Sequence, residues 1–221
     1  MGIPVIVYGK SGSGKSRSLK RFAEDEIVFI NVERKMLPFK GRFKYELKSD
    51  DISEIKRWLT AMKKQNVHTA VIDDAGYLMT NQFMYGHSAP RSGSSSFDLF
   101  NDIADNFWGL LEYIKQQLPD ETIVYIMMHE NTSDYGDTKL RTIGKLLDEK
   151  VCIEGMTTIA IRCMTEGSRH FFKVRTDGSD ITKTPEDMFG TDTVENDLKA
   201  VDTVIREYYE LNNTKETDNN E

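Results

Sequence analysis

The segment from Gly9 to Ser16 constrains the fold of this chain more than any other. It reads Gly-Lys-Ser-Gly-Ser-Gly-Lys-Ser, a complete G-x-x-x-x-G-K-[ST] phosphate-binding loop. An apolar run from Ile3 to Tyr8 precedes it, and a helix-forming stretch from Lys15 to about Asp25 follows it. Glycines let backbone N–H groups converge on phosphate oxygens, and the start of a helix presents its positive end to them. This strand–loop–helix context predicts a nucleotide site rather than an ordinary glycine-rich turn.

The loop also gives each of its residues an expected role. Lys15 would reach the β- and γ-phosphates, and the Ser16 hydroxyl would ligate Mg²⁺. We expect ATP as the nucleotide, because the Asn/Thr-Lys-x-Asp motif with which GTPases read the base is absent. Thr138–Arg141 and Thr182–Pro185 both fail at its last position. The remaining positions would surround the phosphates, namely Gly9, Lys10, Ser11, Gly12, Ser13 and Gly14.

Predicted strands and helices alternate along the rest of the chain. An α/β fold follows, with a mainly parallel β-sheet flanked by helices and a late antiparallel hairpin. The hairpin is predicted at Thr157–Cys163 and His170–Thr176, on either side of a Glu-Gly-Ser turn. Apolar runs predict further strands at Ile27–Val32, Thr69–Asp73, Thr122–Met128 and Val151–Ile153, and helical spacing predicts helices at Asp50–Gln65, Phe97–Leu118 and Val194–Leu211.

Length and composition indicate one domain over residues 1–211, followed by an acidic, disordered tail over residues 212–221. No apolar run approaches the roughly 20 residues of a membrane span, and no signal-peptide pattern is present. We therefore expect a cytoplasmic protein, in the host cytoplasm if the chain is viral, with Cys152 and Cys163 reduced. The net charge of −7 argues against a surface that binds nucleic acid throughout, but it allows a local basic site.

Polar residues follow the predicted strands, where ligands bind in sheets of this kind. Asp73 closes an apolar strand in the Walker B pattern and would hold Mg²⁺ through water. Asp74 could polarise the attacking water or cap the next turn. Glu33 could orient that water, or it could be an ordinary surface residue. His129 could contact the γ-phosphate or only satisfy a hydrogen bond at a strand end.

Several stretches that follow one another in order make the chain resemble the small RecA-like P-loop ATPases of bacteriophages, the Sak-type group tied to single-strand annealing and recombination. Besides the loop, they are Val32-Glu33, Ile72–Asp74, Met128–Glu130, Thr142–Leu147, Thr182–Pro185, Met188-Phe189 and Asn196–Asp202. The resemblance implies a RecA-type core and an ATPase that acts on single-stranded DNA in phage recombination or replication. It also implies that Glu33 is the catalytic carboxylate and that His129 couples the ATP state to DNA-contacting loops.

The resemblance places those loops at about Thr80–Phe97 and Glu130–Lys145. Their cations could bind a phosphate backbone, and Tyr135 could stack on a base. Solvated loops with ordinary charges are the alternative. The candidate DNA-binding cations are Lys139, Arg141, Lys145 and Arg91.

ATPases of this type act between subunits, with a cation supplied by the neighbour, so a homo-oligomer is expected. The cations that could act in this way could equally be charges on an ordinary exposed sheet face, which is the alternative interpretation. No assembly element precedes the first strand, so a partner such as a single-strand-binding protein could load the ATPase. Two other functions stay open, a nucleotide-dependent switch or loader for a replication or packaging protein and a small-molecule kinase. The candidate cations are Lys173, Arg175, Lys183 and Arg162.

Overall fold

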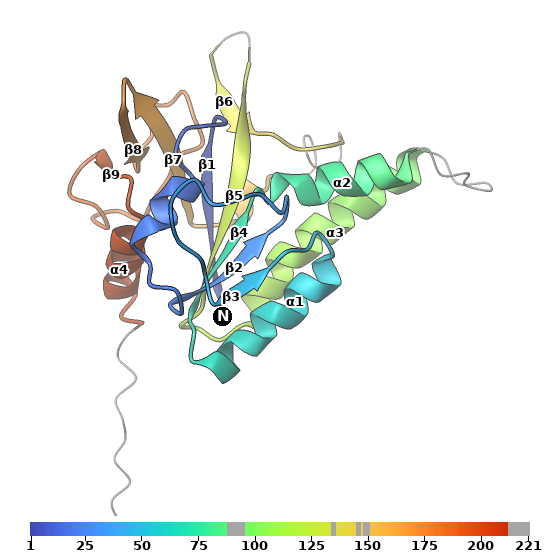
Figure 1. Cartoon of the computed structure of the whole chain (residues 1–221). Helices are drawn as coiled ribbons and strands as arrows, with labels where there is room; N and C mark the ends of the chain where they lie inside the picture. The colour runs from blue at the N-terminus through green and yellow to red at the C-terminus, as the bar shows by residue number, and fades with distance from the viewer. Residues whose placement is uncertain (88–95, 134–135, 145–146, 148–150, 212–221) are drawn as a thin grey trace, which may run out of the picture.

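The computed structural model describes residues 1–87, 96–133, 136–144, 147 and 151–211, so the predicted tail lies outside the described residues. These residues form a nine-stranded sheet in the order β3-β2-β4-β5-β1-β7-β8-β9, with β6 paired to β5 alone (Figure 1). The strands are β1 Ile3–Gly9, β2 Ile27–Asn31, β3 Tyr45–Leu47, β4 Thr69–Asp73, β5 Ile123–Thr132, β6 Thr138–Leu140, β7 Ile159–Glu166, β8 Arg169–Lys173 and β9 Thr193–Glu195. The helices are α1 Ile52–Ala61, α2 Gly76–Gly86, α3 Ser96–Gln117 and α4 Leu198–Tyr208, with the 3-10 helices η1 Ser16–Arg21, η2 Met62–Gln65 and η4 Glu154–Met156.

The strands from β3 to β7 along this order run parallel, and β8 and β9 add antiparallel strands at one edge. This confirms the predicted α/β class with a mainly parallel sheet and a late hairpin. Because every parallel strand ends at the same edge, the residues after β1, β2, β4 and β5 gather there. None of the described helices has both the length and the apolar character needed to cross a membrane.

The near-continuous apolar runs of the central strands are explained by helices on both faces of the sheet (Figure 1). Along β1, Ile6 and Tyr8 face the core under α1, α2 and α3, whereas Val5 and Val7 face the core under α4 and η1. All four side chains are fully buried. Strand side chains alternate between faces, so one run serves two cores and fixes β1 in the middle of the sheet.

Several elements differ from the prediction. The helix after the loop is the short 3-10 helix η1 rather than a helix to Asp25. The C-terminal helix begins at Leu198 instead of Val194, because Asp197 caps it by accepting hydrogen bonds from the N–H groups of Lys199 and Ala200, and the residues before the cap form β9. The strand predicted at Val151–Ile153 is wrong, because Ile153 reaches the core from a turn that leads into η4.

The loop predicted at Thr80–Phe97 is also wrong for its described part, since α2 continues to Gly86 and α3 begins at Ser96. Leu78 and Met79 of α2 are buried in the core, so tertiary packing makes a helix where local periodicity is weak. The loop predicted at Glu130–Lys145 instead contains the end of β5 and β6, which pair antiparallel. Packing and strand pairing, rather than local propensity, determine the secondary structure of both segments.

Candidate nucleotide-binding site

The phosphate-binding loop leaves β1 at the carboxyl edge of the sheet, where β1 pairs with β5 on one side and β7 on the other. Gly12 and Gly14 adopt φ of 78° and 105°, a region that side chains disfavour. Within the described part of the chain, the N–H groups of Gly12, Gly14 and Lys15 donate to no other residue. Amides that converge in this way without protein acceptors form a nest for an anion.

Lys15 is buried inside the curve of this loop, with 6% of its surface exposed. Its Nζ donates to the carbonyl oxygens of Gly9 and Lys10, both at 3.0 Å, and lies 3.5 Å from Nδ1 of His129. Burial lowers the pKa of the Lys15 ammonium. A phosphate would replace these neutral partners with negative charge, so the residue fits the predicted phosphate contact.

Ser16 and Asp73 meet next to the loop, although they lie far apart in the sequence. The Ser16 hydroxyl donates to Oδ1 of Asp73 at 3.0 Å. Burial, together with the charge of neighbouring Asp74, raises the pKa of Asp73 to about 6. A buried carboxylate that lacks a full counter-charge, beside a hydroxyl, is a donor set that suits a hard dication with phosphate and water as its other ligands.

Asp74 lies beside this pair in a left-handed conformation with φ of 58°. Its carboxylate accepts hydrogen bonds from Nζ of Lys35 at 2.7 Å and from Nε2 of His129 at 3.2 Å. The second contact places the proton of His129 on Nε2, which leaves Nδ1 to accept from Lys15. Burial alone would raise the pKa of Asp74, but the hydrogen bonds from His129 and Lys35 outweigh it and lower the pKa to about 2.

These side chains line a cavity of about 370 Å³, which is in the size range of small-molecule sites. The segment after β2 contributes Lys35, Met36, Leu37 and Pro38 to the lining. Among the predicted catalytic residues, Lys15, Asp74 and His129 meet in this cavity. Glu33 does not line it, because Oε1 of Glu33 accepts a hydrogen bond from Nδ2 of Asn81 on α2 at 3.2 Å.

The predicted DNA-contacting cations are only partly described. Lys139 is exposed on β6, and Arg141 is exposed directly after that strand. The backbone N–H of Arg141 donates to the carbonyl of His129 at 2.8 Å, and both residues line a neighbouring cavity of about 320 Å³. Lys139 and Arg141 are thus held by backbone hydrogen bonds to β5, the strand that carries His129. Arg91, Tyr135 and Lys145 lie outside the described residues.

The candidate cations for a neighbouring subunit mostly contact carboxylates of their own chain. Lys173 pairs with Asp177 and Asp180, at 3.0 and 2.9 Å. Arg175 is exposed and pairs with Asp192 at 2.9 Å. Lys183 is half-buried in a loop whose backbone pairs with β7 at Ala160. Action in trans stays a prediction for all of these cations.

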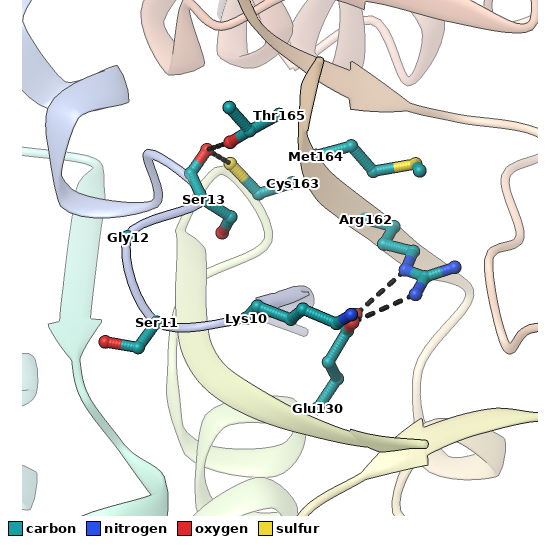
Figure 2. A pocket seen from close by; sticks show the side chains of 9 residues that line it. All are labelled: Lys10, Ser11, Gly12, Ser13, Glu130, Arg162, Cys163, Met164 and Thr165. Carbon is teal, nitrogen blue, oxygen red and sulfur yellow. Dashed lines mark hydrogen bonds and ion pairs between the residues drawn. The ribbon is translucent and has the colours of Figure 1, made fainter. Parts of the chain in front are cut away.

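Arg162 is enclosed as well, with 13% of its side chain exposed. Its guanidinium donates to both carboxylate oxygens of Glu130, at 2.8 and 2.9 Å (Figure 2). It also donates to Oδ2 of Asp180 at 3.3 Å. Arg162 and Glu130 line a second cavity of about 390 Å³ on β7 beside the loop. This bidentate pair joins Glu130, the residue after His129, to strand β7 of the β7–β8 hairpin.

A comparison with known protein families finds a match to part of the chain. Residues 5–90 match the family described as viral superfamily 1 RNA helicase core domain, over a region that contains the loop, Glu33, Asp73 and Asp74. The chain has a RecA-like P-loop NTPase fold. The match covers less than half of the chain and supports, at a coarse level, a P-loop domain that binds and hydrolyses nucleotides. No curated protein matches the chain.

Sequence reasoning missed the residues that hold the P-loop from the hairpin side. The carbonyl of Ser13 accepts from the thiol of Cys163 at 3.1 Å and the hydroxyl of Thr165 at 3.2 Å (Figure 2). It also accepts from Nδ1 of His170 at 2.8 Å. Asn196 adds a hydrogen bond to the carbonyl of Gly14 at 3.2 Å. No local motif marks these residues, because only the pairing of β7 with β1 brings them to the loop.

Proposed function

We propose that the protein is a Mg²⁺-dependent ATPase that acts on single-stranded DNA in phage recombination or replication. The observation that carries the ATPase proposal is the arrangement at one sheet edge of Lys15, the Ser16–Asp73 pair and the Asp74–His129 pair. These groups surround a cavity that can hold the phosphates of a nucleotide. Three strands, β1, β4 and β5, position these residues, so the arrangement is a property of the fold and not of one local motif.

In this proposal Lys15 and the free N–H groups of the loop bind the phosphates. Ser16 and Asp73 hold Mg²⁺, directly and through water. A bound Mg²⁺ supplies neutralisation of the negative charge that builds up on the phosphates. His129 contacts the γ-phosphate end of the site, and its position between Lys15 and Asp74 supports this role.

We propose Glu33 as the general base, with Asp74 as the alternative. Asp74 lines the cavity, but a carboxylate with a pKa of about 2 accepts a proton poorly near neutral pH. Glu33 is held by Asn81 on α2, so its side chain must rotate toward the cavity before it can act as the base. Glu33 lies two residues before Lys35, which lines the cavity, and this supports its proximity to the site.

Glu33→Gln should keep ATP affinity within about twofold and lower kcat by roughly 100-fold or more, the usual effect of removing a general base. Asp74→Asn should retain most of the turnover. The measurements are nucleotide affinity by fluorescence titration and steady-state hydrolysis. Glu24→Gln, at an exposed position away from the cavity, is the matched control. The reverse ranking of the two variants would assign the base to Asp74.

The DNA part of the proposal rests on the β5–β6 hairpin. It continues directly from His129, and the cations Lys139 and Arg141 lie on its exposed part. A conformational change at the γ-phosphate of ATP could therefore be transmitted along β5 to the cations that would contact the phosphate backbone of DNA. The match to a helicase core domain and the resemblance to phage annealing ATPases both support a nucleic-acid role. A homo-oligomer and a single-strand-binding partner complete the proposal.

A nucleotide-dependent switch or loader is the second candidate function. The position of Glu33, turned toward α2 and outside the cavity lining, favours it, because a base held there would give slow hydrolysis. Such a protein would bind ATP tightly and would co-purify with a replication or packaging protein in a manner that nuclease treatment does not change. Loss of that association after nuclease treatment would argue for the DNA-directed ATPase.

A further inference from the structure

A second cation of the same subunit lies inside the nucleotide cavity. Lys35 follows β2, and its Nζ is 2.7 Å from Oδ2 of Asp74 and 5.1 Å from the centre of the Tyr77 ring. It lines the same cavity as Lys15 and Ser16, and Asp74 and His129 connect it to Lys15 by hydrogen bonds. An ammonium here is close to the place where the phosphates of a nucleotide on Lys15 would end.

The backbone of Lys35 is held in place by a specific side chain. Oδ1 of Asn31 accepts from the N–H of Lys35 at 3.0 Å, and Nδ2 of Asn31 donates to the carbonyl of Lys35 at 2.7 Å. Nδ2 of Asn31 also donates to Glu46 on β3 at 3.0 Å. Asn31 is buried, with 3% exposed, and lies in register with Asp73 on the adjacent strand. Lys35 is thereby fixed relative to the strand that carries the metal-side carboxylates.

The turn between Asn31 and Lys35 has a conformation that allows their paired hydrogen bonds. Arg34 has φ of 56°, a left-handed conformation that reverses the chain, and its N–H donates to the carbonyl of Asn31 at 3.3 Å. The side chain of Lys35 keeps its reach, since 57% of it is exposed, so it can change partners without moving the turn. Backbone anchoring combined with a mobile ammonium is what a phosphate contact formed during the reaction requires.

Three of the cations predicted to act in trans have carboxylate partners outside this cavity. Arg17 lines the cavity as well, and its guanidinium donates to Oδ1 of Asn196 at 3.1 Å. Lys173 and Arg175 form ion pairs with carboxylates of the hairpin and the β9 region, and Arg162 is held by Glu130 and Asp180. Lys35 instead pairs with Asp74, a residue of the cavity itself. A phosphate oxygen that enters this cavity competes with Asp74 for the same ammonium.

We propose that Lys35 acts in cis as the cation that stabilises the charge developing on the γ-phosphoryl group, exchanging Asp74 for a phosphate oxygen. This rests on the proposed ATPase function. Water attacks the γ-phosphorus, the bond from that phosphorus to the β–γ bridging oxygen breaks with its electron pair leaving on ADP, and the water proton passes to the general base. Lys35 forms only charge-assisted hydrogen bonds, and Asp74 keeps its contact with His129.

Lys35→Met removes the charge and keeps most of the side-chain stem, and Lys35→Arg restores a cation. We expect Lys35→Met to lower kcat by roughly 100-fold to 1,000-fold, as removal of one transition-state donor does, and Lys35→Arg to recover part of it. ADP affinity should stay unchanged, whereas affinity for ADP with aluminium fluoride should fall by a similar factor. Lys40→Met, at an exposed position of the same segment, should behave as wild type.

A mixing experiment separates action in cis from action in trans. Lys35→Met and Lys15→Ala chains are mixed at equal amounts. If Lys35 acts within its own subunit, the mixture hydrolyses ATP no faster than its components. Recovery of turnover on mixing would overturn the proposal, since the Lys15→Ala chain would then supply Lys35 to its neighbour. Turnover of Lys35→Met within twofold of wild type would also overturn it.

Absence of hydrolysis in the wild-type protein would contradict the proposed function and not yet the role of Lys35. In that case the ratio of the affinity for ATP to the affinity for ADP tests whether Lys35 contacts the γ-phosphate. A ratio that falls at least tenfold in Lys35→Met supports contact between Lys35 and the γ-phosphate. A ratio equal to that of wild type overturns it.

Discussion

Replacement of Lys15 with alanine should weaken ATP binding by at least about 100-fold, equivalent to roughly 3 kcal/mol. The buried ammonium bonds to the loop carbonyls of Gly9 and Lys10 and to Nδ1 of His129, all neutral acceptors, so a phosphate placed in the same curve would be its one charged partner. Without it, phosphate charge would lie in a low-dielectric pocket beside Asp73 and Asp74 with one fewer cation. Nucleotide titration with a fluorescent ATP analogue measures the loss.

Lys20→Ala is the matched control for that variant, because Lys20 is exposed on η1 just beyond the loop. The control should bind nucleotide as wild type does. Thermal unfolding of both variants shows whether the loop remains folded. An affinity of Lys15→Ala within a few-fold of wild type, in a folded protein, would contradict the placement of the phosphates on this loop.

Asp202→Ala should lower the free energy of unfolding by roughly 3–5 kcal/mol, the cost of leaving one partner of a buried charge pair alone. Asp202 on α4 accepts hydrogen bonds from Nε of Arg206 at 2.7 Å, the phenol of Tyr125 at 3.0 Å and the hydroxyl of Thr69 at 3.2 Å. Tyr125 is fully buried, and burial followed by the Asp202 charge raises the pKa of its phenol. Loss of the carboxylate removes the counter-charge and the Nε acceptor of Arg206, whose other donors bond only to neutral oxygens, and it leaves the phenol of Tyr125 without its acceptor.

Urea unfolding measures this difference, with Thr203→Ala as the control on the exposed face of the same helix. The control should change stability by no more than about 0.5 kcal/mol. Asp202 also fixes α4 to the start of β4 and β5, so the loss reports on the docking of that helix. A destabilisation below about 1 kcal/mol would show that water or another donor replaces the network.

The candidate site could be predicted to a large extent because its residues follow strands that the sequence marks clearly. Lys15, Asp73 and His129 are far apart in the chain, but each comes at or after the end of a run of buried apolar residues. Parallel strands bring such positions to one edge whatever the details of the helices. The alternation of strand and helix was therefore enough to predict that these side chains meet.

The orientation of individual side chains could not be predicted in the same way. Glu33 and Lys35 lie on one turn, and the sequence favours the carboxylate for the cavity. The left-handed residue Arg34 and the paired hydrogen bonds of Asn31 instead direct Lys35 into the cavity, with Glu33 toward α2. Such a turn depends on side-chain contacts with the neighbouring strand, which no local propensity records.

Helix α2 and the β5–β6 hairpin were missed for a related reason. Gly76 begins α2, and glycine is a poor helix former, so the helix depends on Leu78 and Met79 packing into the core. Strand β6 exists only because β5 continues to Thr132 and offers it a partner. Both segments were expected to be loops, and both are shaped by tertiary contacts.

Steady-state ATP hydrolysis with and without single-stranded DNA, in the presence of Mg²⁺ and with Lys15→Ala as the blank, tests the central claim most directly. We predict Mg²⁺-dependent turnover that rises several-fold with DNA and is absent from the blank. Hydrolysis that ignores DNA would favour the nucleotide-dependent switch. Turnover no greater than that of Lys15→Ala at saturating ATP, with or without DNA, would contradict the claim that this P-loop site is a DNA-directed ATPase.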